Sequence, residues 1–149
     1  MNINGQYAQA LASLLSQIQE AQPNTAGATQ QQRYGAGNID LYNRPQYRNP
    51  DGSVSTVDSM SFNDNGQEVL VPTVGFGSYG QPTRMNDDQA IQRYYDTGEY
   101  LGKFNSIPDA DRYAQQLHNA QADLYPSGGR GAELQNTYAQ LLRMAGMTP

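Results

Sequence analysis

The stretch Asn63-Asp64-Asn65-Gly66, which leads into Glu68-Val69-Leu70-Val71-Pro72-Thr73-Val74, decides the fold of this chain. The first four residues are turn formers, and Asn-Gly is a strong signal for a tight hairpin turn. The following run is apolar and rich in β-branched residues, which favours a strand. Pro72 cannot donate a backbone hydrogen bond, so it indicates an edge position or a strand end. We therefore expect an antiparallel sheet built around this turn.

Two more strands are expected before this turn. Residues 54–62 are rich in Ser, Val and Thr, and residues 39–47 form a short apolar and aromatic stretch. The turn formers Asn49-Pro50-Asp51-Gly52 lie between them, which predicts a hairpin. Together with residues 68–74, these segments predict a three-stranded antiparallel meander. The glycine-rich residues 75–80 are expected to form a flexible loop.

Two helices are expected after the loop. Asn86 is a suitable N-cap, Gln89 can complete a capping box with it, and Gly98 can end the first helix. Ser106, followed by Pro108, begins a second helix whose apolar residues recur at helical spacing up to Pro126. One face of this second helix should cover the sheet. The strands and the two helices together therefore predict an α+β module over residues 38–126.

Both ends of the chain predict an amphipathic helix. Residues 1–21 form the first and residues 127–149 contain the second, while residues 22–37 have the composition of a linker. The apolar stripes of the two helices comprise Tyr7, Leu11, Leu14 and Ile18 in the first and Leu134, Tyr138, Leu141, Leu142 and Ala145 in the second. The expected fold class is therefore α+β: a small three-stranded antiparallel sheet covered by two helices, with additional N- and C-terminal amphipathic helices.

The composition excludes several classes of protein. A chain of 149 residues fits one domain with one core. It contains no Cys, which excludes disulfides and thiolate zinc sites. The net charge of -5 disfavours nucleic acid as the main partner, because such binding depends on clustered Lys and Arg. The first residues lack a basic region, and no apolar run approaches about 18 residues, so we expect neither an export signal nor a membrane span.

The motifs of enzyme and metal sites are missing from the sequence. The single histidine, His118, borders an apolar helix face, where a structural role is the more common one. No Gly-x-Ser-x-Gly motif is present, and the Asn-Asp-Asn-Gly run does not meet the calcium-loop pattern. The paired acids Asp87-Asp88 lie in the first turn of a predicted helix, where they complement the helix dipole. We expect no catalytic residue, no cofactor and no metal.

One group of residues has two interpretations. Tyr42, Arg44, Tyr47 and Arg48 alternate aromatic rings with guanidinium groups, as in sites that stack bases or sugars. Tyrosines also pack beside arginines across strands for purely structural reasons. Both a ligand-binding and a structural interpretation therefore follow from the sequence.

The chain contains, in this order, the segments Gly37-Asn38-Ile39-Asp40-Leu41-Tyr42-Asn43-Arg44-Pro45, Asn49-Pro50-Asp51-Gly52-Ser53-Val54-Ser55-Thr56-Val57, Glu68-Val69-Leu70-Val71-Pro72-Thr73-Val74, Ala90-Ile91, Tyr94, Thr97-Gly98-Glu99, Leu101-Gly102-Lys103-Phe104, Tyr113-Ala114 and Leu117-His118. Together these segments resemble a module of tailed-bacteriophage virion proteins. The resemblance covers roughly residues 37–125, and the chain departs from the module at Asp58, where a basic residue is expected, and in a longer loop at residues 75–84. Such modules occur in internal or ejected virion proteins and in tail proteins.

The resemblance implies a virion structural or accessory protein of the neck, tail or capsid interior, made in the host bacterial cytoplasm. Its expected partners are other virion proteins (portal, neck, tail or capsid) and further copies of itself in a homo-oligomer. The terminal helices would dock on these partners through Leu11, Leu14, Ile18, Leu134, Leu141 and Leu142. Alternatively, the two helices form an intramolecular pair on the module. The alternative function is a cell-wall glycan-binding or lytic accessory protein of the phage entry apparatus that uses Tyr42, Arg44 and Tyr47.

Overall fold

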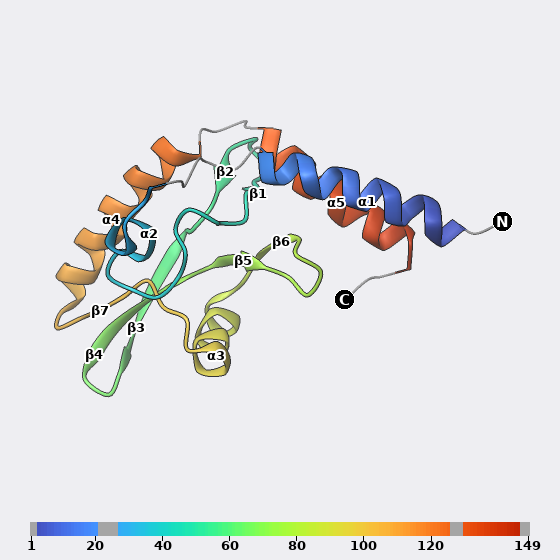
Figure 1. The fold of residues 1–149 in the computed structure, drawn as a ribbon. Helices are drawn as coiled ribbons and strands as arrows, with labels where there is room; N and C mark the ends of the chain where they lie inside the picture. The colour runs from blue at the N-terminus through green and yellow to red at the C-terminus, as the bar shows by residue number, and fades with distance from the viewer. Residues whose placement is uncertain (1–2, 21–26, 126–129, 147–149) are drawn as a thin grey trace.

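The computed structural model describes residues 3–20, 27–125 and 130–146. Within these residues the chain is an α+β protein with a three-stranded antiparallel sheet, two small hairpins and five helices (Figure 1). The expected fold class is therefore confirmed. The elements in chain order are α1 (Ile3–Glu20), α2 (Gln30–Tyr34), β1 (Tyr47–Arg48), β2 (Val54–Ser55), β3 (Ser59–Asp64), β4 (Gln67–Pro72), β5 (Val74–Phe76), β6 (Pro82–Arg84), α3 (Asp87–Thr97), β7 (Gly102–Phe104), α4 (Ile107–Leu124) and α5 (Arg130–Met144).

The hairpin β3–β4 forms around the turn that the sequence predicts. Asp64 pairs with Gln67 across Asn65 and Gly66, whose φ angles of 52° and 86° both lie in the left-handed region. Asn and Gly tolerate this conformation better than other residues, which is why Asn-Gly determines the register here. Pro72 is the last residue of β4, so it lies at a strand end, as one of its two expected positions requires.

The predicted meander is wrong in its third strand. The sheet order is β3–β4–β7, and β7 reaches β4 from far along the chain through pairs such as Leu70 with Gly102. Residues 39–47 are mostly irregular. Only the end of this stretch is in a strand, β1, which pairs with β2 in a separate two-stranded sheet. Asn38 explains this difference, because its side chain donates to Gly98 O (2.9 Å) and accepts from Tyr100 N (2.8 Å). Those bonds attach the segment to the connection before β7 instead of the sheet.

The single strand predicted over residues 54–62 is divided in two. Asp58 has a φ of 24°, and this left-handed residue separates β2 from β3. Its backbone carbonyl accepts hydrogen bonds from Thr73 N (2.6 Å) and Thr73 Oγ1 (3.0 Å). The turn at Asp58 therefore directs β2 away from the central sheet.

The predicted helices α3 and α4 cover opposite faces of the central sheet. Asn86 and Gln89 form the expected capping box of α3, and Gly98 ends it in the left-handed conformation. Side chains alternate along β4, as in any strand. On one face, Val69 and Val71 pack with Ala90 and Tyr94 of α3. On the other face, Leu70 packs with a second set of buried residues, one of which, Leu117, lies on α4. The other members of this set are Ile39, Leu41, Val57 and Leu101.

Two segments expected to be unstructured are ordered. Residues 75–80, expected as a flexible loop, are part of the hairpin β5–β6, which spans residues 74–84. The predicted linker contains α2, with a capping box between Thr29 and Gln32, and Ala36 N donates to the hydroxyl of Tyr113 on α4 (3.0 Å). The rest of that linker, residues 22–26, lies outside the described residues. The packed module therefore begins before residue 38.

The terminal helices α1 and α5 pack side by side and extend away from the module (Figure 1). The α5 helix also contacts β1 and β6, so it joins the pair to the module. The two helices thus pair within the chain, as the intramolecular alternative expects, but the pair projects from the module instead of lying along it. In the part of the chain that the structure describes, no helix combines the length and the apolar character that a membrane crossing requires.

Candidate functional site

The junction between the module and the helix pair is held by polar contacts. The backbone N–H of Gln46 donates to Oε1 of Gln135 on α5 at 2.7 Å, and Gln135 is only 3% exposed. Close by on α5, Glu133 accepts from the Arg48 guanidinium at 2.9 Å. A buried hydrogen bond is worth more than an exposed ion pair, so Gln135 is the stronger of the two anchors. The α5 helix is thus positioned on the module by its N-terminal half.

The six predicted docking residues are all buried or half-buried in the folded chain. Ile18 and Leu142 are buried, with 7% and 5% exposure. Leu11, Leu14, Leu134 and Leu141 are half-buried. The exposed apolar side chains on these helices are different ones, Leu15 (45%) and Met144 (68%). Sequence reasoning missed them because each lies beside the stripe, and only the position of the partner helix shows which side of the stripe remains exposed.

Two cavities lie where the β5–β6 hairpin meets the helix pair, and Tyr79 lines both of them. The first has a volume of about 330 Å³ and the second about 260 Å³. Aromatic and aliphatic groups from the hairpin, β1 and both terminal helices line them. The apolar members are Tyr47, Tyr79, Pro82, Ala139 and Leu142 in the first cavity and Leu15, Ile18, Phe76, Tyr79 and Tyr138 in the second.

Arg44 lies in the interior of the module and is 5% exposed. Its Nε donates to Thr56 O at 2.9 Å, and its Nη2 donates to Val74 O. Burial lowers the pKa of Arg44 to about 10. Both partners are neutral carbonyls, so Arg44 joins the segment after β2 to β5 and is not presented to an external ligand.

Gln121 and Tyr125, at the C-terminal end of α4, extend this buried polar cluster. The hydroxyl of Tyr125 accepts the backbone N–H of Arg44 at 3.1 Å, and burial raises the pKa of Tyr125 to about 12. Gln121 accepts from Thr56 Oγ1 at 2.7 Å and donates to Leu41 O at 2.9 Å. These contacts attach the irregular segment 39–46 to α4, because they satisfy polar groups that would otherwise be buried without partners.

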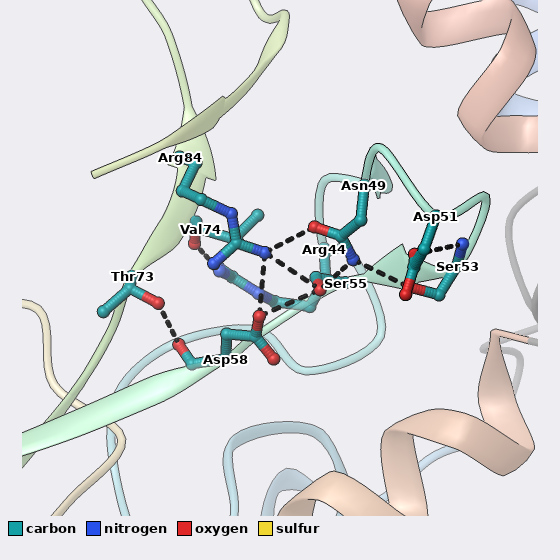
Figure 2. Close-up of polar contacts among 9 residues, drawn as sticks. All are labelled: Arg44, Asn49, Asp51, Ser53, Ser55, Asp58, Thr73, Val74 and Arg84. Atoms are coloured by element: carbon teal, nitrogen blue, oxygen red, sulfur yellow. Dashed lines mark hydrogen bonds and ion pairs between the residues drawn. The ribbon is translucent and has the colours of Figure 1, made fainter. Parts of the chain in front are cut away.

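Arg84 forms a second cluster nearer the surface (Figure 2). Its Nη2 donates to Asp58 Oδ2 (2.8 Å), Asn49 Oδ1 (2.7 Å) and Ser55 Oγ (3.1 Å). The guanidinium also lies 5.1 Å from the ring centroid of Tyr47. Asp58 is thus the anion that holds the β5–β6 hairpin against β1 and β2.

The four residues of the alternating aromatic and arginine pattern do not form one ligand surface. Arg44 is buried, Arg48 pairs with Glu133, and Tyr47 packs beneath Arg84. Tyr42 packs against the core beside α4. The geometry therefore favours the structural interpretation of these residues, and Tyr47 is the one of the four that lines a described cavity.

His118 is exposed and lines a cleft of about 400 Å³ between residues 53–58 and α4. Asp58 and Ser55 line the same cleft, and the Ser55 hydroxyl donates to Asp58 Oδ2 at 2.9 Å. Among the described residues, no group of three or more His, Cys, Asp or Glu side chains could hold a metal ion. Within those residues, the cleft thus has polar walls but no arrangement of metal ligands.

No protein-family model, no curated protein and no solved structure matches this chain.

Proposed function

We propose that this protein is a structural or accessory component of a tailed-phage virion, located at the neck, in the tail or in the capsid interior, and that it acts through protein–protein contacts without catalysis. The observation that carries the proposal is the pair of helices α1 and α5, which extends from a module with its own core. The residues of both core clusters belong to the module and not to the pair. A projecting element of this kind is available to a neighbouring subunit.

The surface of the helix pair supports binding to another protein. Within its 18 residues α1 has only one charged residue, Glu20, so its solvent side is made largely of Gln, Ser, Ala and Leu15. Interface cores are likewise depleted of charge. The exposed Leu15 and Met144 supply apolar area that the helix pair leaves uncovered. The phage setting comes from the resemblance of residues 37–125, and the docking role comes from this surface.

The helix pair is also long enough to form an interface with a second copy. Eighteen helical residues span about 27 Å, and two adjacent helices are about 20 Å wide. A face of this size on each of two copies amounts to roughly 1,000 Å² in total, which reaches the lower limit for a specific interface. A homo-oligomer held by these helices is therefore part of the proposal.

The experiment compares the native mass of three proteins by light scattering over a range of concentrations. We expect the wild type to form a defined oligomer and the double variant Leu15→Ser, Met144→Ser to dissociate. The control is Ile107→Ser, because Ile107 is a similarly exposed apolar residue (58%) on the module, and this variant should keep the wild-type mass. Ile18 is unsuitable for this test, since its buried side chain stabilises the pair itself.

The same variants test the role in the particle. In phage carrying the double variant, we expect particles that lack the protein, whereas the Ile107→Ser protein should be incorporated normally. A monomeric wild type together with normal incorporation of the double variant would show that the helix pair has no docking role.

A lytic accessory role is the competing proposal, and the shared cleft of His118, Asp58 and Ser55 is the observation in its favour. The contacts of these residues count against it, because Ser55 donates to Asp58, and Asp58 is already paired with Arg84. Release of soluble muropeptides from peptidoglycan, lost on His118→Ala, would establish the lytic role. Unchanged peptidoglycan would support the non-catalytic proposal.

A further inference from the structure

In the part of the chain that the structure describes, one cationic side chain without a partner lies at a cavity whose wall is part polar and part apolar. Arg143 of α5 lines the 330 Å³ cavity next to Tyr79 and makes neither an ion pair nor a hydrogen bond within the described residues. Every other Arg or Lys side chain that the structure describes has a partner. These pairs are Arg33 with Asp40, Arg44 with two carbonyls, Arg48 with Glu133, Arg84 with Asp58, Arg93 with Glu99, Arg112 with Asp109 and Lys103 with the rings of Tyr94 and Tyr100.

Much of the remaining cavity wall is apolar and aromatic. Tyr47 and Tyr79 supply rings, and Leu142 and Ala139 of α5 supply aliphatic surface. The cavity volume of about 330 Å³ lies at the small end of the range for ligand sites, which suits a single large side chain better than an extended cofactor. An aromatic side chain that enters such a cavity contributes most of its binding energy by leaving water.

The polar groups at the cavity suit a peptide. The side-chain amide of Asn136 makes no hydrogen bond within the described part of the chain, so it can donate to or accept from a peptide backbone. Arg143 can add a bidentate contact to a carboxylate. In a chain with a net charge of -5, this position offers a carboxylate an uncompensated positive charge.

From this geometry we propose that the cavity between β6 and α5 is a docking site for a peptide segment of a neighbouring protein, in which an aromatic or large apolar side chain fills the cavity and an adjacent carboxylate pairs with Arg143. The proposal deepens the proposed function and rests on it, since α5 is the docking helix. It adds the chemistry of the partner: an acidic, aromatic-containing segment. The cavity is lined by both α5 and the β5–β6 hairpin, so a partner that binds there also contacts the module.

The test uses a matched pair of small probes, N-acetylphenylalanine and its neutral amide N-acetylphenylalaninamide, with the purified full chain. Both have the aromatic ring and the peptide group, and only the first has a carboxylate. Amide resonances of the protein are followed by NMR during titration. We expect the carboxylate probe to bind with a dissociation constant on the order of 1 mM and to shift the resonances of Tyr79, Ala139 and Leu142.

The charge contribution is isolated by one variant and its control. Arg143 is exposed, so the neutral amide should bind only about three- to fivefold more weakly than the acid. Arg143→Gln should abolish this difference. Arg112→Gln, which removes an exposed arginine on α4, should preserve it. Equal binding of acid and amide to the wild type, or shifts that map elsewhere, would overturn the proposal.

A peptide arm distinguishes protein docking from capture of a small carboxylate. An acetylated tetrapeptide Ala-Phe-Asp-Ala with an amidated C-terminus should bind at least as tightly as N-acetylphenylalanine, because the Asp side chain supplies the carboxylate within a longer chain. If the fragment binds and the tetrapeptide does not, the cavity is a small-molecule site and the docking proposal is wrong. These assays need no virion, so a failure of the proposed phage role leaves their outcome unaffected.

Discussion

Replacing Gly37 by Ala should destabilise the module strongly, although Gly37 lies in a segment with the composition of a linker. A Cβ at this position would lie 2.2 Å from Tyr100 O and 2.5 Å from Leu101 C, both backbone atoms. Backbone cannot rotate away as a flexible side chain can, so the two segments have to separate. The φ of Gly37 is not in the left-handed region, and the effect is therefore one of space and not of backbone strain.

The cost follows from what that separation breaks. Asn38 N donates to Tyr100 O at 3.1 Å and Asn38 Oδ1 accepts from Tyr100 N at 2.8 Å, and both bonds join the segments that would move apart. Each lost hydrogen bond costs about 1 kcal/mol, and overpacking adds about 2 kcal/mol. We expect a loss of about 4 kcal/mol in the free energy of unfolding. With an ordinary urea dependence, the denaturation midpoint falls by about 2 M.

The assay is urea denaturation followed by far-ultraviolet circular dichroism, with Gly5→Ala as the matched control. Gly5 lies within α1 and has open space around its Cβ position, so Ala there should raise helix stability by about 0.5 kcal/mol. A Gly37→Ala protein whose stability lies within about 0.5 kcal/mol of the wild type would refute the reasoning, since surface substitutions away from such contacts have effects of that size.

Three further substitutions, at the buried residues Tyr125 and Gln135 and at the left-handed residue Asn65, have expected outcomes. Tyr125→Phe should remove a phenolate absorbance step near the pKa of about 12 and cost about 1–3 kcal/mol by leaving the Arg44 N–H unpaired. Folding raises the pKa of Tyr125 above its ordinary value of 10.0. The stabilisation by Tyr125 is therefore complete below pH 10 and is lost as the pH rises to 12. Denaturation midpoints measured across that range will test this loss. Gln135→Leu should leave the buried N–H of Gln46 unpaired, loosening α5 from the module, and faster hydrogen exchange of that amide will measure the effect. Asn65→Ala should cost about 1 kcal/mol, measured by thermal unfolding, because Ala tolerates the φ of 52° poorly.

Elements determined by local interactions could be predicted from the sequence. The capping box of Asn86 and Gln89 and the left-handed Gly98 define α3, and the Asn65-Gly66 turn defines the β3–β4 hairpin. Each depends on residues that are close in the sequence. Local sequence alone is therefore sufficient to predict α3 and the central hairpin.

Elements determined by distant contacts could not be predicted. The strand β7 has only three residues and exists because it pairs with β4, and the irregular path of residues 39–46 depends on Arg44 and Tyr125, which are far apart in the sequence. Asp58 lies in a stretch whose composition favours a strand. In the structure it instead has a left-handed φ and forms an ion pair with Arg84. Nothing near Asp58 in the sequence indicates which arginine it will meet.

The candidate site, too, depends on distant contacts and could not be predicted from the sequence. An alternating aromatic and arginine pattern is compatible with a ligand site at Arg44 and Arg48, yet in the folded chain Arg44 is buried against backbone carbonyls and Arg48 pairs with Glu133. A charged side chain is available to a partner only where the fold leaves it without an ion pair or hydrogen bond. Which side chain this is depends on all the pairings that the other charged side chains make. Arg143 has no distinguishing pattern around it, and it becomes the candidate because every other described Arg and Lys has a partner. In the proposed docking site, recognition of a partner therefore depends on which pairings the fold leaves open.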